Sequence, residues 1–149
     1  MLISKYALVL FALAFSGCFN VAESANARTG GSLIRSDFAG NFFTEICLIT
    51  APNFQEVPQA IAGEPFYRHQ ETGTYFHKFA DLSIKVSEYG CALVFKSELS
   101  IDETISGLAA GTAKTAKKWN VTLPRNLDIT SHPSPDGRGR YFRIGLPRQ

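Results

Sequence analysis

The stretch LSIKVSEYGCALVFK, Leu82 to Lys96, decides the fold. Its first six residues alternate between apolar and polar side chains, which is typical of a strand with one buried face. A second apolar run begins at Cys91, and only a short segment around Tyr89 and Gly90 separates the two runs. Two strands joined by so short a loop pair antiparallel. The sequence therefore predicts a β-hairpin here.

Burial predicts the register of this hairpin. A two-residue loop at positions 89–90 pairs Val86 with Leu93, so that the apolar rows of both strands share one face. A three-residue loop would instead place Leu93 opposite Lys85, because a slip of one residue exchanges the two faces of a strand. We therefore expect the two-residue loop, in which Cys91 points inward.

Cys91 has one expected partner in the same domain. Of the three cysteines, Cys18 lies near the N-terminus, and Cys47 lies beside the apolar stripe of a helix predicted over residues 37–50. Two cysteines in an exported chain most simply form an intramolecular disulfide. A Cys47–Cys91 bond would close a loop of about 45 residues and contribute on the order of 3–4 kcal/mol. The alternative, a thiol nucleophile, is disfavoured by an oxidising compartment.

Other elements surround the hairpin. A short helix is predicted within residues 53–63, where Asn53 would begin a capping box and a glycine ends the segment. Ser100 and Glu103 form a second capping box, which opens the longest predicted helix, to about Trp119. Its glycines and alanines predict a smooth face that lies close against the sheet.

These patterns predict an α+β fold. We expect N-terminal helices, an antiparallel meander of about four strands, one long helix packed on the sheet and a loop-rich C-terminal extension. Residues 36–120 would form the core domain, and residues 121–149 the basic extension. Within that extension, residues 141–144 are expected to return as an edge strand with Arg143 pointing outward.

The N-terminal segment resembles an export signal. An apolar run of ten residues, 6–15, follows a lysine and is too short to span a bilayer. Small residues at 25–27 predict cleavage after Ala27, leaving residues 28–35 as a flexible linker and a periplasmic or secreted protein. In the alternative, the stretch before Cys18 resembles the lipobox of bacterial lipoproteins, although it carries phenylalanine where an aliphatic residue is usual. The protein would then be lipid-anchored through Cys18.

Charge is distributed unevenly along the chain. Residues 36–113 contain ten acidic and four basic side chains, whereas residues 114–149 contain eight basic and two acidic ones. The basic end is a candidate contact for an anionic partner, through Arg138, Arg140 and Arg143. In the alternative, the basic end folds over the acidic part and neutralises it.

Aromatic side chains gather in a second predicted hairpin, whose turn includes Thr72 and Gly73. With a three-residue loop, four of them share one face and form a candidate binding surface. These four are Tyr67, His69, Tyr75 and His77. With a two-residue loop the two histidines point to opposite faces. Neither register supplies a third ligand, so no metal site is predicted.

No catalytic or cofactor motif is recognised, and we expect no cofactor. Ser131, His132 and Asp136 lie too close together in a proline-broken segment to converge as a triad. The sequence therefore favours an exported, non-catalytic binding, inhibitory or accessory protein. Its expected partner is another envelope protein or a cell-envelope polymer, with peripheral membrane contact at the basic end and no nucleic acid. The alternatives are a small periplasmic hydrolase and a subunit of an envelope complex.

Overall fold

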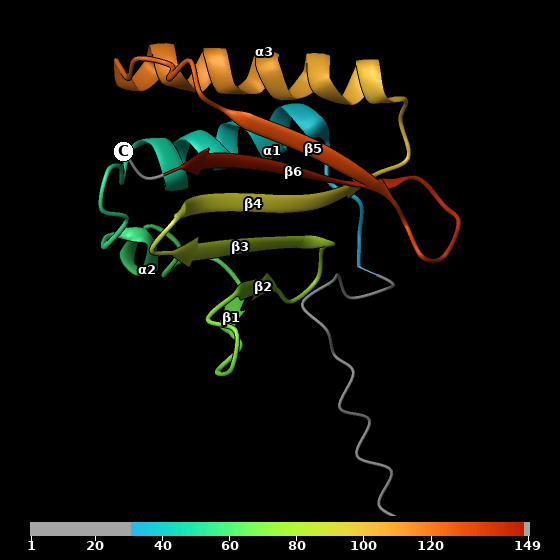
Figure 1. Cartoon of the computed structure of the whole chain (residues 1–149), viewed down its shortest axis with the longest axis horizontal. Helices are drawn as coiled ribbons and strands as arrows, with labels where there is room; N and C mark the ends of the chain where they lie inside the picture. Colours follow the sequence, from blue (N-terminus) through green and yellow to red (C-terminus); the bar gives the residue numbers. More distant parts are fainter. Residues whose placement is uncertain (1–30, 148–149) are drawn as a thin grey trace, which may run out of the picture.

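Six strands form one antiparallel sheet in residues 31–147, which the computed structural model describes, in the order β1-β2-β3-β4-β6-β5 (Figure 1). The strands are β1 (Phe66–Arg68), β2 (Tyr75–His77), β3 (Leu82–Ser87), β4 (Gly90–Ser97), β5 (Asp128–Pro133) and β6 (Arg140–Pro147). The helices are α1 (Ser36–Phe43), the π-helical turn η1 (Thr44–Leu48), α2 (Val57–Ala60) and α3 (Ile101–Trp119). The α+β class is confirmed, with six strands instead of about four. The expected signal cleavage after Ala27 and the alternative lipidation of Cys18 fall outside the described residues.

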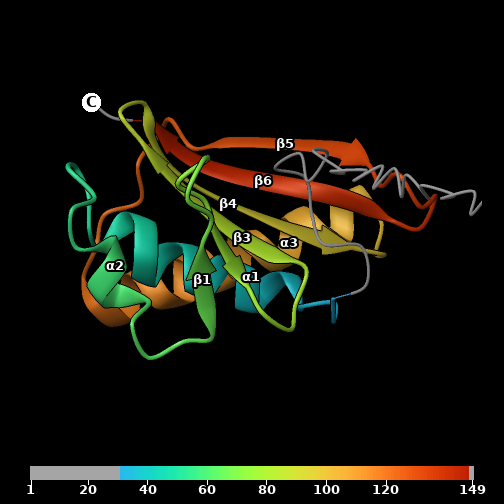
Figure 2. The ribbon, with the colours of Figure 1, turned by 90° about the horizontal axis from the view of Figure 1, so that it is seen from below.

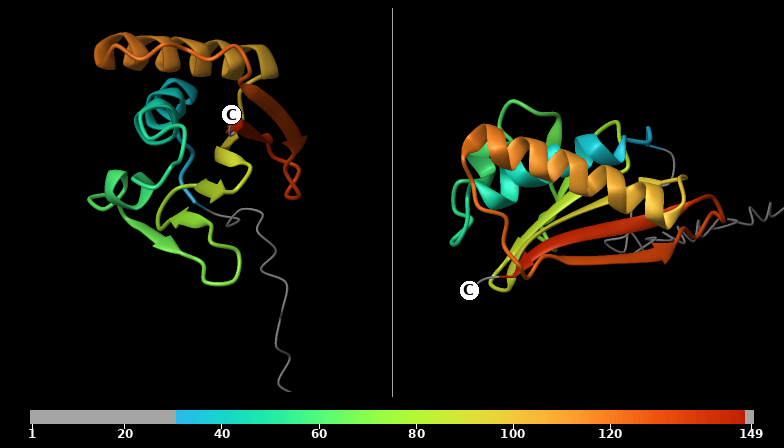
Figure 3. Two further views of the ribbon diagram at one scale, coloured as in Figure 1. Left: turned by 60° about the vertical axis from the view of Figure 1, so that its left-hand side comes forward. Right: turned by 90° about the horizontal axis from the view of Figure 1, so that it is seen from above.

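The helices cover one side of the sheet, with α1 lying between α3 and the strands (Figures 1 and 3). Helices α1 and α3 approach closely because glycines line the contact. A Cβ atom at Gly111 would lie 2.0 Å from the carbonyl oxygen of Asp37, and one at Gly40 would lie 2.4 Å from that of Leu108. The smooth face of α3 therefore packs on α1, and α3 also packs on the helical side of the sheet as predicted, where the hydroxyl groups of Thr104 and Ser97 lie 3.0 Å apart and Leu108 joins the core.

Helix α3 begins and ends where its sequence predicts. The Ser100 hydroxyl accepts a hydrogen bond from the Glu103 backbone N–H at 3.3 Å, and the Glu103 carboxylate accepts one from the Ser100 N–H at 3.1 Å. This is the expected capping box. The capping box predicted at Asn53 is wrong, because α2 begins after Glu56, which makes no side-chain cap. No helix within residues 31–147 has the length and apolarity needed to cross a membrane.

The central hairpin has the predicted faces but a different register. Strands β3 and β4 pair Val86 with Cys91 and Ile84 with Leu93, so the loop consists of positions 88–89. A shift of two residues preserves the face of each side chain, so the apolar rows still meet. Gly90 belongs to the strand because β6 passes close to it: a Cβ there would lie 2.2 Å from the Leu146 carbonyl oxygen.

The C-terminal region is part of the core, which corrects the predicted loop-rich extension and edge strand. Strand β6 pairs with β4 on one side and β5 on the other. Phe142 is fully buried, and its ring stacks on that of Phe95 at a centroid distance of 5.8 Å. Charged or small residues interrupt the apolar pattern of β6, so its sequence resembles an edge strand although its neighbours bury it.

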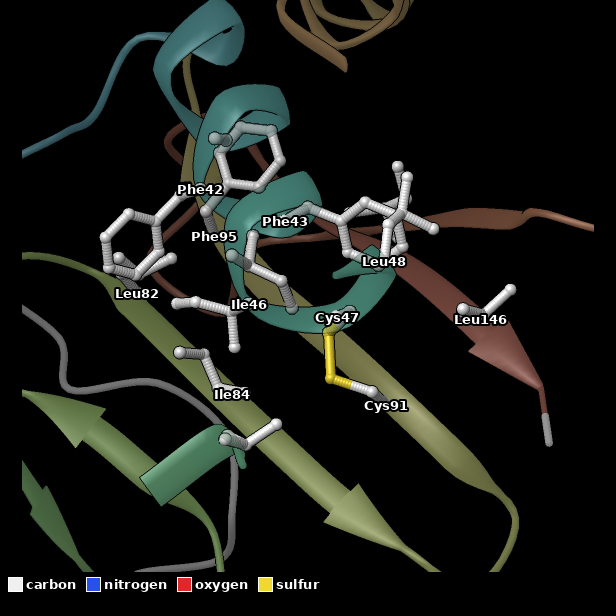
Figure 4. Close-up of a cluster of buried hydrophobic side chains, with 14 of the residues drawn as sticks. Phe42, Phe43, Ile46, Cys47, Leu48, Leu82, Ile84, Cys91, Phe95 and Leu146 are labelled. Atoms are coloured by element: carbon white, nitrogen blue, oxygen red, sulfur yellow. A yellow bond between two sulfur atoms is a disulfide. The ribbon is translucent and has the colours of Figure 1, made fainter. Parts of the chain in front are cut away.

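The core lies between α1–η1 and the inner face of the sheet (Figure 4). Phe43 and Ile46 from the helical side pack with Ile84 from β3. The predicted disulfide between Cys47 and Cys91 is confirmed, with a Cα–Cα distance of 5.5 Å. It fixes η1 to β4 and is consistent with an exported protein.

Candidate functional site

The side of the sheet turned away from the helices is open within residues 31–147 (Figure 2). Strand register places Lys85, Ala92, Gly145 and Asp128 in one row across β3, β4, β6 and β5. Charged side chains stand at the two ends of this row, and the smallest side chains lie in its middle. The sheet surface is therefore depressed in the middle of this row and bordered by charged side chains at its two ends.

This open face contains a hollow of about 530 Å³. Six of its lining residues matter for the argument: Ser83, Lys85, Ser87, Ala92, Asp128 and Arg143. Ligand sites in proteins typically have volumes of roughly 300–1,000 Å³. The hollow is therefore large enough for a small ligand or a short segment of a polymer. We call it the open-face groove.

Arg143 crosses the floor of the open-face groove. Its Nη1 donates to Asp128 Oδ2 at 2.5 Å, and a Cβ atom at position 145 would lie 2.9 Å from the guanidinium nitrogens. Gly145 therefore leaves the space that the guanidinium occupies. Lys85 lies at the opposite rim, is exposed, and forms no ion pair with another residue of 31–147. The groove thus combines one paired and one unpaired cation.

A second set of ionisable residues lies around a small hollow that shares Ser83 and Val94 with the lining of the open-face groove. Lys96 pairs with Tyr141 across β4 and β6, and its backbone N–H donates to the Asp81 carbonyl oxygen at 3.1 Å. The Lys96 side chain is only 6% exposed, and its Nζ donates to Asp136 Oδ2 at 2.5 Å. Asp81 is also buried and accepts a hydrogen bond from the Gly31 N–H at 3.2 Å. We call Asp81, Lys96, Asp136 and Tyr141 the buried polar cluster.

The surroundings shift the pKa of each member of this cluster. Burial raises the pKa of the Asp81 carboxyl and that of the Tyr141 phenol. The hydrogen bond between Lys96 and Asp136 raises the pKa of Lys96 and holds that of Asp136 well below its usual range. Lys96 and Asp136 are therefore a charged pair over the whole neutral range.

The buried polar cluster leaves little room for a ligand. The hollow lined by Asp81 and Tyr141, together with Ser83 and Val94, has a volume of about 10 Å³. That is about the space needed by one water molecule. The cluster ties β4, β6 and the turn between β5 and β6 together, so its arrangement is explained by stability.

The predicted aromatic surface does not form. Strands β1 and β2 pair Tyr67 with Phe76, and the His69 N–H donates to the Thr74 carbonyl oxygen at 2.8 Å, so four residues form the loop. A loop with an even number of residues separates the two histidines, as in the alternative register. Tyr67 and His69 lie on the open side, whereas Tyr75 and His77 lie on the other.

The two histidines have local partners. The His77 ring nitrogen Nδ1 accepts hydrogen bonds from the backbone N–H groups of Phe79 and Ala80, at 3.2 and 3.0 Å. Burial lowers the pKa of His77, which keeps this acceptor unprotonated at neutral pH. His69 Nδ1 accepts from the Thr72 N–H at 3.4 Å. Among residues 31–147, no three potential ligands gather into a metal site.

The three arginines proposed as one anionic contact are dispersed. Arg138 lies in the exposed turn between β5 and β6, Arg140 donates to Ser131 Oγ at 3.3 Å, and Arg143 crosses the groove. Successive side chains of a strand alternate between faces, and Arg140 and Arg143 are three positions apart, so the two point to opposite sides. The sequence shows that basic residues are close together in the chain, but it did not predict that strand β6 would direct their side chains to different faces.

Sequence reasoning did not identify Asp81, Asp128 or Tyr141 as parts of a site. The alternating pattern placed Lys85 on the polar face of the hairpin, and the inward position of Cys91 implies the same face for Lys96, which is the signal that could have found both. Their neighbours from β5 and β6 depend on which strands pair, and periodicity carries no such information.

Comparison with known proteins finds no match to a family model, to a curated protein or to a solved structure. The function is therefore argued from the site itself.

Proposed function

We propose that this protein is an exported, non-catalytic binding domain that holds its ligand in the open-face groove. The observation that carries the proposal is the hollow of about 530 Å³ on a sheet face that the described helices leave uncovered. The disulfide between Cys47 and Cys91 supports an oxidising location, periplasmic or extracellular, reached through the signal in residues 1–27.

The chemistry of the groove suggests what it binds. The hydroxyl groups of Ser83 and Ser87 offer hydrogen bonds, and the ammonium of Lys85, which forms no ion pair in the described part of the chain, offers a site for an anionic group. Arg143 keeps donors beyond the one that Asp128 occupies. A carboxylate-bearing segment of an envelope protein or of a cell-envelope polymer fits this lining.

The small volume beside the buried ionisable groups argues against catalysis. The ionisable groups nearest the groove whose pKa values are shifted form the buried polar cluster, where about one water molecule fits. A catalytic group must come within hydrogen-bond reach of its substrate. The groove can hold a ligand, but the hollow at the cluster, which adjoins it at Ser83 and Val94, is too small to admit one.

A small hydrolase is the second candidate. The observation in its favour is that Asp81, Lys96, Tyr141 and His132 follow one another across four neighbouring segments of the sheet, beside the groove. Asp81, Lys96 and Tyr141 have shifted pKa values, and perturbed ionisable groups beside a concavity are a recognised feature of active sites. Asp81→Asn and His132→Ala distinguish the two candidates, because each should abolish hydrolysis and leave ligand binding in the groove intact.

Photo-cross-linking tests the binding proposal. A photoreactive amino acid at Ser87 places the probe in the groove, and the same probe at Lys114 places it on the exposed face of α3. The tagged protein is expressed with its native signal, irradiated in cells, and its adducts are identified by mass spectrometry. We expect a defined adduct from Ser87 and none from Lys114.

The adduct should also depend on groove chemistry. Lys85→Glu reverses the unpaired charge and should reduce the Ser87 adduct, whereas Glu88→Lys alters a nearby exposed charge outside the lining and should not. Equal adducts from both probe positions, or none from Ser87, would overturn the proposal.

A further inference from the structure

The two edges of the sheet differ. At one edge, β1 has three residues, and a short edge strand offers little backbone for pairing. At the other edge, β5 has six residues, and within residues 31–147 its pairing partner is β6. Five of those six residues are exposed. Strand β5 therefore presents a long row of unpaired backbone groups.

Strand β5 also lacks the features that protect edges. Its register with β6 runs without a bulge from Asp128 to Pro133, the proline stands at the end, and positions 129–132 carry no lysine, arginine or carboxylate. Natural edge strands commonly use bulges, interior prolines or charges to prevent pairing. The side chain of Ile129, on the helical side of β5, is 38% exposed, so a partner that covered it would bury apolar surface.

The side chains of β5 are complementary to a second copy of themselves. In a symmetric antiparallel pair, Thr130 faces Thr130, and Asp128 faces His132 of the second copy. The open faces of both copies then lie on the same side, because residues that face each other share a face. Asp128 uses Oδ2 for Arg143, so its Oδ1 is available to the imidazole.

We propose that the protein forms a twofold-symmetric dimer by pairing β5 with β5 of a second copy, centred on Thr130. Threonine pairs are favourable cross-strand neighbours, and an imidazole N–H of His132 can donate to Asp128 Oδ1 of the second copy. The contact is isologous, so it closes at two copies. This goes beyond ligand binding, and it brings two open-face grooves onto one continuous sheet surface.

Cysteine cross-linking tests the register. Thr130→Cys should give an interchain disulfide on mild oxidation, read by non-reducing electrophoresis and mass spectrometry. Ile129→Cys and Ser131→Cys should each give little product alone but should cross-link when the two proteins are mixed, because those positions face each other. No interchain product, or equal product from all three variants alone, would overturn the proposed pairing.

A matched pair of variants tests the charge complementarity. His132→Asp places two carboxylates opposite each other twice in the dimer, and His132→Lys places opposite charges there. We expect His132→Asp to weaken dimerisation roughly tenfold relative to His132→Lys, since both symmetric pairs change together. Sedimentation equilibrium of the chain without its signal, over a concentration series, measures this. Equal dissociation constants, or a monomer at every concentration, would contradict the proposal.

Discussion

At the scale of single residues, the close contact between α1 and α3 depends on glycines, which have no side chain. Gly40, Gly107 and Gly111 each face an atom of the opposite helix, so even one methyl group would collide there. Glycine lowers helix propensity by roughly 1 kcal/mol relative to alanine. Close approach of the two helices explains why these positions carry glycine nevertheless.

Gly111→Ala is therefore expected to destabilise the protein, although alanine is the better helix former. Its Cβ would lie 2.0 Å from the backbone oxygen of Asp37, and backbone cannot move aside as a flexible side chain can. Overpacking of this kind costs about 1–3 kcal/mol. Urea denaturation measures the change. Gly63→Ala is the control, because a Cβ there meets no atom within 4 Å, and its stability should be unchanged or higher.

The ion pair between Lys96 and Asp136 predicts a dependence of stability on pH. The pKa of Asp136 is depressed in the folded protein, so its contribution is present above the unfolded pKa of about 4 and is lost as pH falls through the folded value. The pKa of Lys96 is raised, so its contribution is present at neutral pH and is lost at high pH.

Asp136→Asn should accordingly lower the melting temperature at pH 7, because it leaves the Lys96 ammonium buried without its partner. The difference from the wild-type protein should shrink below pH 4. The raised pKa of Asp81 acts in the opposite direction, but its main cause is burial, which is the same in both proteins, so most of its effect cancels in the comparison. A difference that stays constant down to pH 2 would contradict this account.

At the scale of elements, the sequence predicted the features that depend on residues close together in the chain. The capping box fixed the start of α3, and alternation fixed the faces of β3 and β4. The inward position of Cys91 then made its bond to Cys47 the simplest pairing. Strand β6 was misplaced because its burial comes from β4 and β5, which are distant in sequence. The open-face groove needs the same pairing, so the sequence could not predict it.

The disulfide joins two elements that pack against each other, η1 and β4. Replacing Cys47 and Cys91 together by alanine should lower the free energy of unfolding by on the order of 3–4 kcal/mol, because the unfolded chain regains the freedom of a loop of about 45 residues. Chemical denaturation measures the loss. Reduction of the wild-type protein should reproduce most of it, and an unchanged midpoint after verified reduction would show that the bond does not stabilise the fold.

At the scale of the whole molecule, the acidic and basic halves of the sequence are interleaved. Lys118 lies 3.8 Å from Glu45, and Asp136 from the C-terminal region meets Lys96 from the central strand. Two ion pairs thus connect the two regions, but only Lys118–Glu45 joins a basic residue of the basic end to an acidic residue of the acidic part, as internal neutralisation would require; in Lys96–Asp136 the signs are reversed. They leave Lys85 as an unpaired cation within residues 31–147, and it lies at the rim of the groove.

Because β6 lies inside the sheet between β4 and β5, we expect the C-terminal third of the chain to be indispensable for folding. A chain that ends at Asn120 lacks β5 and β6, so Phe95 and the disulfide-bearing strand β4 lose their neighbour on one side. We expect such a chain to show no cooperative thermal transition by circular dichroism and to bind a hydrophobic dye. A chain of residues 31–147 keeps the complete sheet and should unfold cooperatively.

Deleting β6 removes the fully buried Phe142 and Ile144, which share the core with α1 and η1. Cooperative unfolding of the truncated chain would mean that residues 36–120 form a domain of their own, as their sequence suggested, and that β6 only lies against it.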